Sequence, residues 1–318
     1  MSRAELVVAS VLFLFACIQV FSPTLGSETR ALHHNWRALL FFIVLAAGYF
    51  GPSVGAMNAS VRSLLPRPTA RLAAGPTILL VASILYARAE QLSVERVAIG
   101  YAAFLYAPVA LLRVRARAPE PAPLQVAAAA AALWLPIEFH LLPALQVAAP
   151  QGFNAVRLIA IVTAFYLFLI GRPLSGIGYT FLLDRRDLKL ACATLGSYAV
   201  VALPLGLATG FLMWHPRVTT GTLLSAPILI YLMTAVPEEF LFRGLIQNVL
   251  QRSLGRRAGL AVAAVVFGLA HLPNPSYVAL ATLAGVAYGW VYSRTGKITA
   301  SAVTHAGVDW LWILLLRQ

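Results

Sequence analysis

The stretch LIAIVTAFYLFLI (158–170) contains no charged residue, and LVVASVLFLFACIQVF (6–21) is a second run of the same kind. With their flanks, such runs approach the roughly 20 residues that cross a bilayer core of about 30 Å. Of the 318 residues, 60% are hydrophobic and 11% are charged, against roughly 25% charged in an average soluble domain. So few charges cannot cover a water-exposed surface. The composition therefore predicts an all-α protein, a polytopic bundle of transmembrane helices in a lipid bilayer.

About eleven apolar segments meet the length expected of a membrane span. They lie near 5–21, 38–56, 73–87, 96–112, 124–148, 155–171, 188–213, 222–252, 257–272, 276–293 and 298–316. Segment 124–148 contains two prolines and two ionisable residues. Proline is tolerated in a membrane helix only where neighbours satisfy the freed backbone groups. This segment therefore spans, forms two half-segments or lies partly along the interface.

The basic residues predict an orientation. The formal net charge is +13. With a cytoplasmic N-terminus, 16 of the 24 Lys and Arg residues fall on the inner side and seven on the outer side. The sixteen are Arg3, Arg62, Arg67, Arg71, Arg113, Arg115, Arg117, Arg172, Arg185, Arg186, Lys189, Arg252, Arg256, Arg257, Arg294 and Lys297. This positive-inside bias supports an odd number of spans, with the N-terminus cytoplasmic and the C-terminus outside. A bacterial-type inner membrane is the expected location. No basic patch is interleaved with aromatic residues, so no nucleic-acid partner is expected.

Cysteine usage gives two further expectations. Cys17 and Cys192 both lie in apolar runs without a CxxC partner, which argues against a disulfide framework. The sequence Leu14-Phe15-Ala16-Cys17 loosely resembles a lipoprotein cleavage box. Phe15 fits that pattern poorly, so a first transmembrane helix is favoured over a cleaved signal.

The charged stretch LDRRDLK (183–189) divides the chain and predicts a cytoplasmic helix start. Residues 1–180 form an N-terminal transmembrane region of unknown role. Residues 181–318 hold almost all the motifs and are expected to form the core that carries the chemistry.

Ionisable residues at membrane depth gather near the C-terminus. They are Glu238, Glu239, Arg243, His271, His305 and Asp309. Placing such a group inside the bilayer costs a few kcal/mol or more, so ionisable residues occur there mainly where they form ion pairs or have a function. A set of interhelical salt bridges that only fixes the packing is the plainer alternative.

The spacing within PEEFLFRG (237–244) separates two adjacent glutamates. Glu239 and Arg243 are four residues apart, share a helix face and can form an ion pair. Glu238 is turned from Glu239 by about 100° and is free to face a cavity. His305 and Asp309 also share a helix face.

These residues stand in a recognisable order, with EExxxR at 238–243, FxxxH at 267–271 and HxxxD at 305–309. On hydrophobic helices, this ordered set resembles the CAAX protease and bacteriocin-processing (CPBP) family of intramembrane proteases. The glycines at 285, 289 and 296 also resemble the family pattern, and the resemblance covers about residues 180–318.

The resemblance implies an intramembrane endopeptidase with a CAAX-protease-like core. In such a site Glu238 would activate water with help from His271, and Glu239 with Arg243 would brace the site. His305 and position 309 would polarise the scissile carbonyl or stabilise the oxyanion. The substrate would be a membrane-associated protein or peptide, and nothing favours prenylated CAAX tails over leader peptides. A proton-coupled transporter and a catalytically silent membrane scaffold are the alternatives, because buried acids and histidines also build proton relays.

Asp309 departs from the family pattern, where many relatives carry Asn. An ionised Asp cannot donate to an oxyanion, so Asp309 orients His305, acts protonated or ligates a metal. His271, His305 and Glu238 are a plausible zinc set. No HExxH spacing is present, which favours a metal-independent glutamate site while leaving zinc open.

Two weaker signals lie in the first 180 residues. Gly51-Pro52-Ser53-Val54-Gly55 fits GxSxG, but that motif marks a nucleophile only at a strand-to-helix turn, and a helix-end turn is expected here. Glu138 and His140 form either a solvated interfacial pair or the lining of a substrate entrance.

Overall fold

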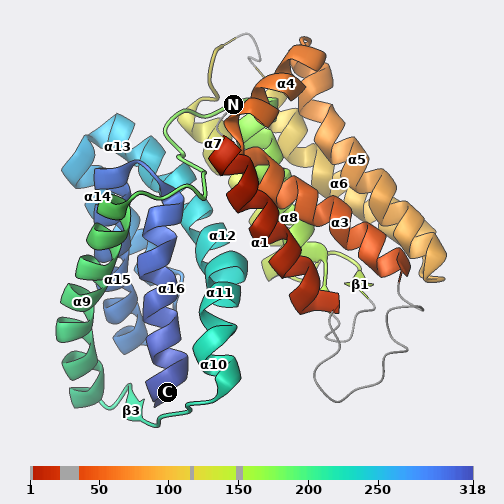
Figure 1. Ribbon diagram of the computed structural model, residues 1–318. Helices are drawn as coiled ribbons and strands as arrows, with labels where there is room; N and C mark the ends of the chain where they lie inside the picture. Colours follow the sequence, from red (N-terminus) through yellow and green to blue (C-terminus); the bar gives the residue numbers. More distant parts are fainter. Residues whose placement is uncertain (1–2, 22–35, 115–117, 148–152, 318) are drawn as a thin grey trace. The chain divides into compact units, whose positions relative to one another are not determined.

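The computed structural model describes residues 3–21, 36–114, 118–147 and 153–317 (Figure 1). These residues are mostly helical, which confirms the all-α class. The chain divides into two compact units, Met1–Leu174 and Ser175–Gln318. Arg115 and Arg117, which entered the charge count above, lie outside the described residues.

The chain is a multi-pass membrane protein. Among the described residues, five helices are long and apolar enough to cross a bilayer: Trp36–Ser53, Pro68–Ala89, Val94–Arg113, Arg185–Ala208 and Ile298–Leu315. The apolar helices Pro123–Glu138 and Val156–Gly171 are shorter. The predicted count of eleven spans is therefore not confirmed, and the orientation of the termini stays a prediction.

The first unit is a bundle of helices with one short hairpin. Its elements are α1 (Arg3–Phe21), α3 (Trp36–Phe50), α4 (Gly55–Leu64), α5 (Pro68–Ala89), α6 (Val94–Arg113), α7 (Pro123–Glu138), β1 (Gln146–Val147), β2 (Phe153–Asn154) and α8 (Val156–Tyr166). Helix α3 packs against α1, α5 and α8, and α6 packs between α5 and α7. Strands β1 and β2 pair antiparallel, with Gln146 opposite Asn154.

The uncertain segment 124–148 is helical only in its first part. Helix α7 ends at Glu138, and His140 has a φ of 52°, a left-handed conformation that cannot continue a helix. The 16 residues of α7 span about 24 Å at about 1.5 Å per residue, less than a bilayer core of about 30 Å. A helix running through to residue 148 is therefore excluded, and the chain continues into the β1–β2 hairpin.

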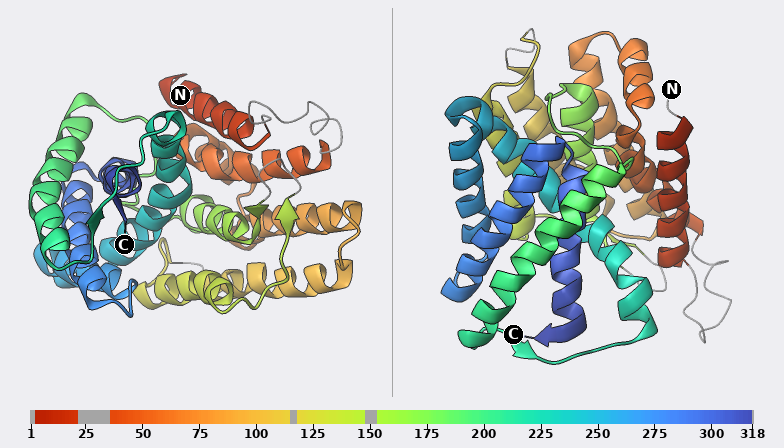
Figure 2. Two further views of the ribbon diagram at one scale, coloured as in Figure 1. Left: turned by 90° about the horizontal axis from the view of Figure 1, so that it is seen from below. Right: turned by 60° about the vertical axis from the view of Figure 1, so that its left-hand side comes forward.

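The second unit is built around one central helix. Its elements are α9 (Arg185–Ala208), β3 (Met213–Trp214), α10 (Thr220–Leu224), α11 (Ala226–Ile230), α12 (Val236–Glu239), α13 (Asn248–Leu254), α14 (Arg256–Leu269), α15 (Pro275–Thr295), α16 (Ile298–Leu315) and β4 (Leu316–Arg317). Helix α16 contacts α9, α15 and the α10–α12 stretch (Figures 1 and 2). Strands β3 and β4 pair antiparallel and connect the end of α16 to the segment after α9.

The predicted helix start near 183–189 is confirmed. Asp184 caps α9, because its carboxylate accepts hydrogen bonds from the backbone N–H groups of Arg186 (2.7 Å) and Asp187 (2.9 Å). The backbone N–H of Asp187, followed by that of Arg186, holds the pKa of the Asp184 carboxyl below its usual value.

Two π-helical turns flank α12 and interrupt the predicted segment 222–252. They cover Tyr231–Ala235 and Phe240–Gln247. Pro237 lacks an N–H and its ring crowds the carbonyl four residues earlier, so a regular α-helical ladder cannot pass through it. The wider turn before Pro237 accommodates this residue, and such turns occur frequently at functional sites.

Glycines allow α14 and α15 to approach closely. A Cβ atom added at Gly285 would lie 2.9 Å from the Cα and carbonyl oxygen of Ala264, which is too close for any larger residue without a shift. Small residues at a helix contact are typical of membrane bundles. The glycine pattern in the sequence therefore has a packing role in the structure.

Candidate active site

Four elements of the second unit carry the predicted site residues, and one of them is the π-helical turn Phe240–Gln247, which carries Arg243. Helix α12 carries Glu238 and Glu239, and α16 carries His305 and Asp309. His271 lies in the turn that follows α14. The site therefore depends on how α12 and α16 pack against each other.

Glu239 is fully buried and has three charged or polar partners. Its Oε2 lies 3.2 Å from Nε of Arg243, as the four-residue spacing predicted. Its Oε1 lies 2.9 Å from Nδ1 of His305, and the hydroxyl of Ser301 donates to Oε2 at 2.5 Å. A buried carboxylate is stable only when paired and hydrogen-bonded, and this set supplies both.

Arg243 is also fully buried and contacts α15 and two aromatic rings. Its Nη2 donates to the carbonyl of Gly285 at 3.3 Å. Its Cζ lies 4.7 Å from the centroid of the Phe267 ring and 5.4 Å from that of Tyr288. Cation–π contacts in a dehydrated site lower the cost of burying the guanidinium.

His305 connects the buried Glu239–Arg243 pair to two carboxylates that are more exposed than that pair. Nδ1 faces Glu239, whereas Nε2 lies 3.8 Å from Oε2 of Glu238 and 3.6 Å from Oδ2 of Asp309. The side chain of His305 is 4% exposed, against 40% for Glu238 and 32% for Asp309. Both distances from Nε2 exceed a hydrogen bond, and a water or substrate atom that bonds both groups has to lie to one side of the line that joins them.

The proton on the buried side of His305 follows from its partner. An ionised carboxylate only accepts hydrogen bonds, so Nδ1 donates its proton to Glu239. The ring is also fixed by Tyr288, which stacks on it with centroids 4.5 Å apart and planes 14° apart. Nε2 is therefore held in one direction, toward Glu238 and Asp309.

His271 has a different environment. Its Nδ1 donates to the carbonyl of Phe267 at 2.9 Å, which leaves Nε2 of the neutral ring as an acceptor. The ring packs edge-on against Tyr277 at 4.5 Å. Within the described residues, the ion pair nearest to Glu238 is with His305 and not with His271. The predicted help from His271 to Glu238 stays a prediction.

Sequence reasoning missed three residues around the site. Ser301 donates to Glu239, Tyr288 stacks on His305 and Tyr277 packs on His271. Ser301 had a detectable signal, because it lies four residues before His305 on the same face of α16. The two tyrosines had none, since aromatic residues are common throughout membrane helices.

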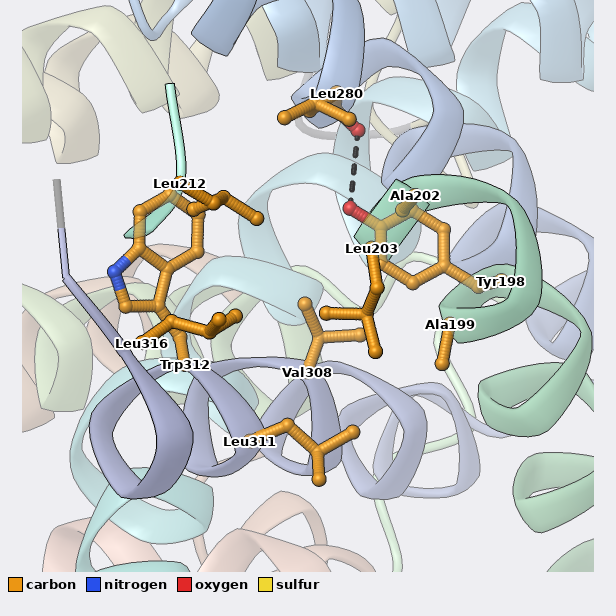
Figure 3. A pocket seen from close by; sticks show the side chains of 10 residues that line it. All are labelled: Tyr198, Ala199, Ala202, Leu203, Leu212, Leu280, Val308, Leu311, Trp312 and Leu316. Carbon is orange, nitrogen blue, oxygen red and sulfur yellow. Dashed lines mark hydrogen bonds between the residues drawn. The ribbon is translucent and has the colours of Figure 1, made fainter. Parts of the chain in front are cut away.

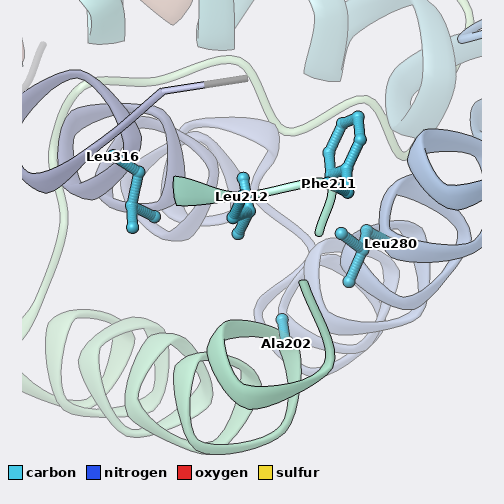
Figure 4. Close-up of a cluster of buried hydrophobic side chains, with 5 residues drawn as sticks. All are labelled: Ala202, Phe211, Leu212, Leu280 and Leu316. Carbon is cyan, nitrogen blue, oxygen red and sulfur yellow. The ribbon is translucent and has the colours of Figure 1, made fainter. Parts of the chain in front are cut away.

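An apolar pocket adjoins the site on the α9 side (Figure 3). Val308, Leu311 and Trp312 of α16 line it, and Val308 immediately precedes Asp309. Tyr198 of α9 forms part of the wall and donates to the carbonyl of Leu280 at 3.3 Å. Four of the lining residues, Ala202, Leu212, Leu280 and Leu316, also belong to a buried hydrophobic cluster whose fifth member is Phe211 (Figure 4).

The weaker candidates lie in the other unit. Ser53 is buried, and its hydroxyl donates to the carbonyl of Phe50, as a helix-end turn requires. Glu138 is exposed and accepts from Nε1 of Trp134 at 3.4 Å. His140 is exposed and lines a cavity of about 420 Å³ together with Arg157.

Metal ligation was predicted as possible for His271, His305 and Glu238. Across the described ranges, no group of three His, Cys, Asp or Glu side chains is arranged to hold a metal ion. His305 and Glu238 approach each other, and Asp309 is the third group beside them. The involvement of a metal stays a prediction.

Comparison with known proteins identifies the C-terminal part of the chain. Residues 219–311 match the family model described as type II CAAX prenyl endopeptidase Rce1-like. Comparisons with curated proteins and with solved structures found no match. The matched segment contains all six predicted site residues: Glu238, Glu239, Arg243, His271, His305 and Asp309. The resemblance to the CAAX protease family is thus confirmed, and residues 219–311 form an Rce1-like region within this membrane protein.

Proposed function

We propose that the protein is an intramembrane endopeptidase that hydrolyses a peptide bond of a membrane-associated protein or peptide with water activated at Glu238. The observation that carries this proposal is the contrast between two adjacent glutamates. Glu239 is fully buried and paired with Arg243, whereas 40% of the Glu238 side chain is exposed. Neighbouring carboxylates in different environments commonly divide structural and chemical roles.

In the proposed reaction, a water molecule lies between Glu238 and the scissile carbonyl. Glu238 takes a proton from that water, and the water oxygen forms a bond to the carbonyl carbon. The Nε2–H of a doubly protonated His305 donates to the oxyanion that develops. The C–N bond then breaks, and Glu238 passes its proton to the leaving amine.

The surroundings of His305 support its role as electrophile. Three carboxylates lie within 4.0 Å of its ring nitrogens and provide countercharge for an imidazolium. Glu239 fixes the ring from the buried side, and Arg243 with Ser301 holds Glu239 in turn. His271 offers Nε2 as an acceptor for the water, which supports the assisting role the family resemblance implies.

The proposal is metal-independent, with zinc as the competing possibility. Asp309 then acts protonated or orients His305, at 3.6 Å from its Nε2. A metal would instead be held by His305 and a carboxylate, with His271 as the further candidate.

Purified protein in lipid nanodiscs tests the activity directly. The probes are two fluorescence-quenched peptides, one ending in a farnesylated CAAX sequence and one carrying an apolar leader segment. We expect cleavage of at least one probe by the wild type and none by Glu238→Ala. Cleavage that survives Glu238→Ala would show that the roles are wrongly assigned. Proton-coupled uptake without hydrolysis would favour the transporter alternative.

A further inference from the structure

Gln247 lies four residues after Arg243 and is 1% exposed. Its Nε2 donates to the carbonyl of Gly289 and to the hydroxyl of Ser293, both at 3.0 Å. Arg243 donates from Nη2 to the carbonyl of Gly285. The two side chains therefore bind glycine carbonyls that are one turn apart on α15.

In the part of the chain that the structure describes, both side chains have buried atoms without a hydrogen bond. For Arg243 these are Nε, which lies 3.2 Å from Glu239 as an ion pair, and Nη1. Within the described residues, Nη1 of Arg243 and Oε1 of Gln247 are both buried and have no hydrogen-bond partner. The rings of Phe267 and Tyr288 stabilise the guanidinium charge, but they do not accept its hydrogens as an oxygen would. Nη1 is a donor and Oε1 is an acceptor, so one small molecule with both functions satisfies the two atoms.

The two glycine carbonyls that anchor these side chains are spaced on a scale that one bridging water can cover. Carbonyls one helical turn apart are separated by about 5.4 Å. A water that makes two hydrogen bonds of about 2.9 Å spans up to about 5.8 Å. The oxygen of Gln247 reaches this place only because residue 289 is glycine, since an added Cβ would lie 2.6 Å from Oε1.

We infer that Gln247 is a positioning residue of the site and that one buried water joins its Oε1 to Nη1 of Arg243. The water gives Nη1 an acceptor and fixes the guanidinium so that Nε stays in its ion pair with Glu239, which in turn fixes Nδ1 of His305. Gln247 thus acts through Arg243 and does not touch the reacting atoms. Its effect on turnover rests on the proposed function, whereas the water site does not.

A structure of the wild-type protein in lipid, at a resolution that shows ordered water, tests the water site. We expect a density peak within hydrogen-bond distance of both Nη1 of Arg243 and Oε1 of Gln247. A direct bond between the two side chains, or a dry gap between them, would overturn the inference. This measurement needs no variant and no substrate.

Turnover of the cleaved quenched peptide tests the positioning role. Gln247→Leu is expected to lower kcat about tenfold to a hundredfold, the range in which misplaced catalytic groups act. KM should change less than twofold, because Gln247 lies away from the substrate.

Gln251→Leu is the matched control. Gln251 also donates to the Ser293 hydroxyl, at 2.8 Å, but lies one further turn from Arg243. We expect near-normal kcat for this variant. An equal loss of kcat in both variants would show that the hydrogen bonds of Gln247 and Gln251 to α15 only support helix packing. If the wild type cleaves neither probe, the proposed function fails while the density still decides the water site.

Discussion

Two buried arginines, one in each unit, have opposite kinds of partner. Arg172, 4% exposed, donates to the backbone carbonyls of Leu112 (2.6 Å), Val114 (3.1 Å) and Glu120 (3.0 Å). It therefore satisfies the carbonyls at and beyond the C-terminal end of α6, which have no partner within the helix. Arg243 instead pairs with the carboxylate of Glu239.

The comparison teaches that a buried charge alone does not identify a functional site. Arg172 donates to the main-chain oxygens named above and also to the side-chain amide oxygen of Gln125 at 3.1 Å. The partner of Arg243 is bonded to His305, whose other nitrogen faces the partly exposed Glu238 and Asp309. From Arg243 the described contacts lead through Glu239 and His305 to two partly exposed carboxylates.

The largest effect is expected from Glu238→Gln. This change keeps the shape of the side chain and removes the base, so cleavage of the quenched peptides should fall about 10²- to 10⁴-fold. The melting temperature should stay within a few degrees of wild type, because the side chain is partly exposed.

Glu95→Gln is the matched control for that change, since Glu95 is an exposed acid at the start of α6. Wild-type turnover is expected for this variant. Full activity in Glu238→Gln would show that Glu238 is not the base and that the contacts of Arg243 do not lead to a catalytic group.

Arg243→Ala should damage folding and activity together. It leaves Glu239 buried and unpaired, at a cost of about 3–5 kcal/mol. We expect a low folded yield, and the folded fraction should have reduced kcat because His305 loses its support. Thermal unfolding and turnover per folded molecule measure the two effects. A stable and fully active variant would show that the Glu239–Arg243 pair has no role.

Arg172→Ala should separate stability from activity. Buried carbonyls that lose their donor cost about 1–3 kcal/mol, so the melting temperature should fall. Turnover per folded molecule should remain at the wild-type level. If Arg172→Ala loses as much turnover as Arg243→Ala, the two arginines do not differ in their effect on activity.

Asp309→Asn is expected to have the smallest effect. In a metal-independent site, Asn supplies an N–H donor beside His305, so activity should be kept or raised, and a chelator should not change it. In a metal site, the same change should reduce activity about tenfold to a hundredfold, and zinc should restore activity after chelation. Turnover with and without chelator decides between them.

Sequence reasoning anticipated the site because its charges are rare and regularly spaced. In an apolar chain, Glu239 and Arg243 four residues apart predict an ion pair, and the structure contains it. The roles assigned to Glu238 and His271 stay predictions. Tyr288 was not found, because an aromatic residue carries no signal against the background of a membrane helix. Ser301 was missed although it lies four residues before His305 on the same face of α16.

The ends of the helices were harder to predict from the sequence than the residues of the candidate site. Hydropathy does not mark where backbone hydrogen bonding changes. The sequence therefore left segment 124–148 open between a span, two half-segments and an interfacial position, and it did not place the end of α7 at Glu138. The π-helical turns around Pro237 were missed for the same reason. Orientation depends on a bilayer, and fusion reporters at the C-terminus are needed to decide it.

The most direct test of the central claim compares protein termini in membranes from three kinds of cell. The cells express the wild type, Glu238→Gln or Arg172→Ala at matched levels. We predict shifted termini of one or more membrane-associated proteins in the wild-type and Arg172→Ala membranes, and none in the Glu238→Gln membranes. Identical termini in the wild-type and Glu238→Gln membranes would contradict an endopeptidase that acts through Glu238.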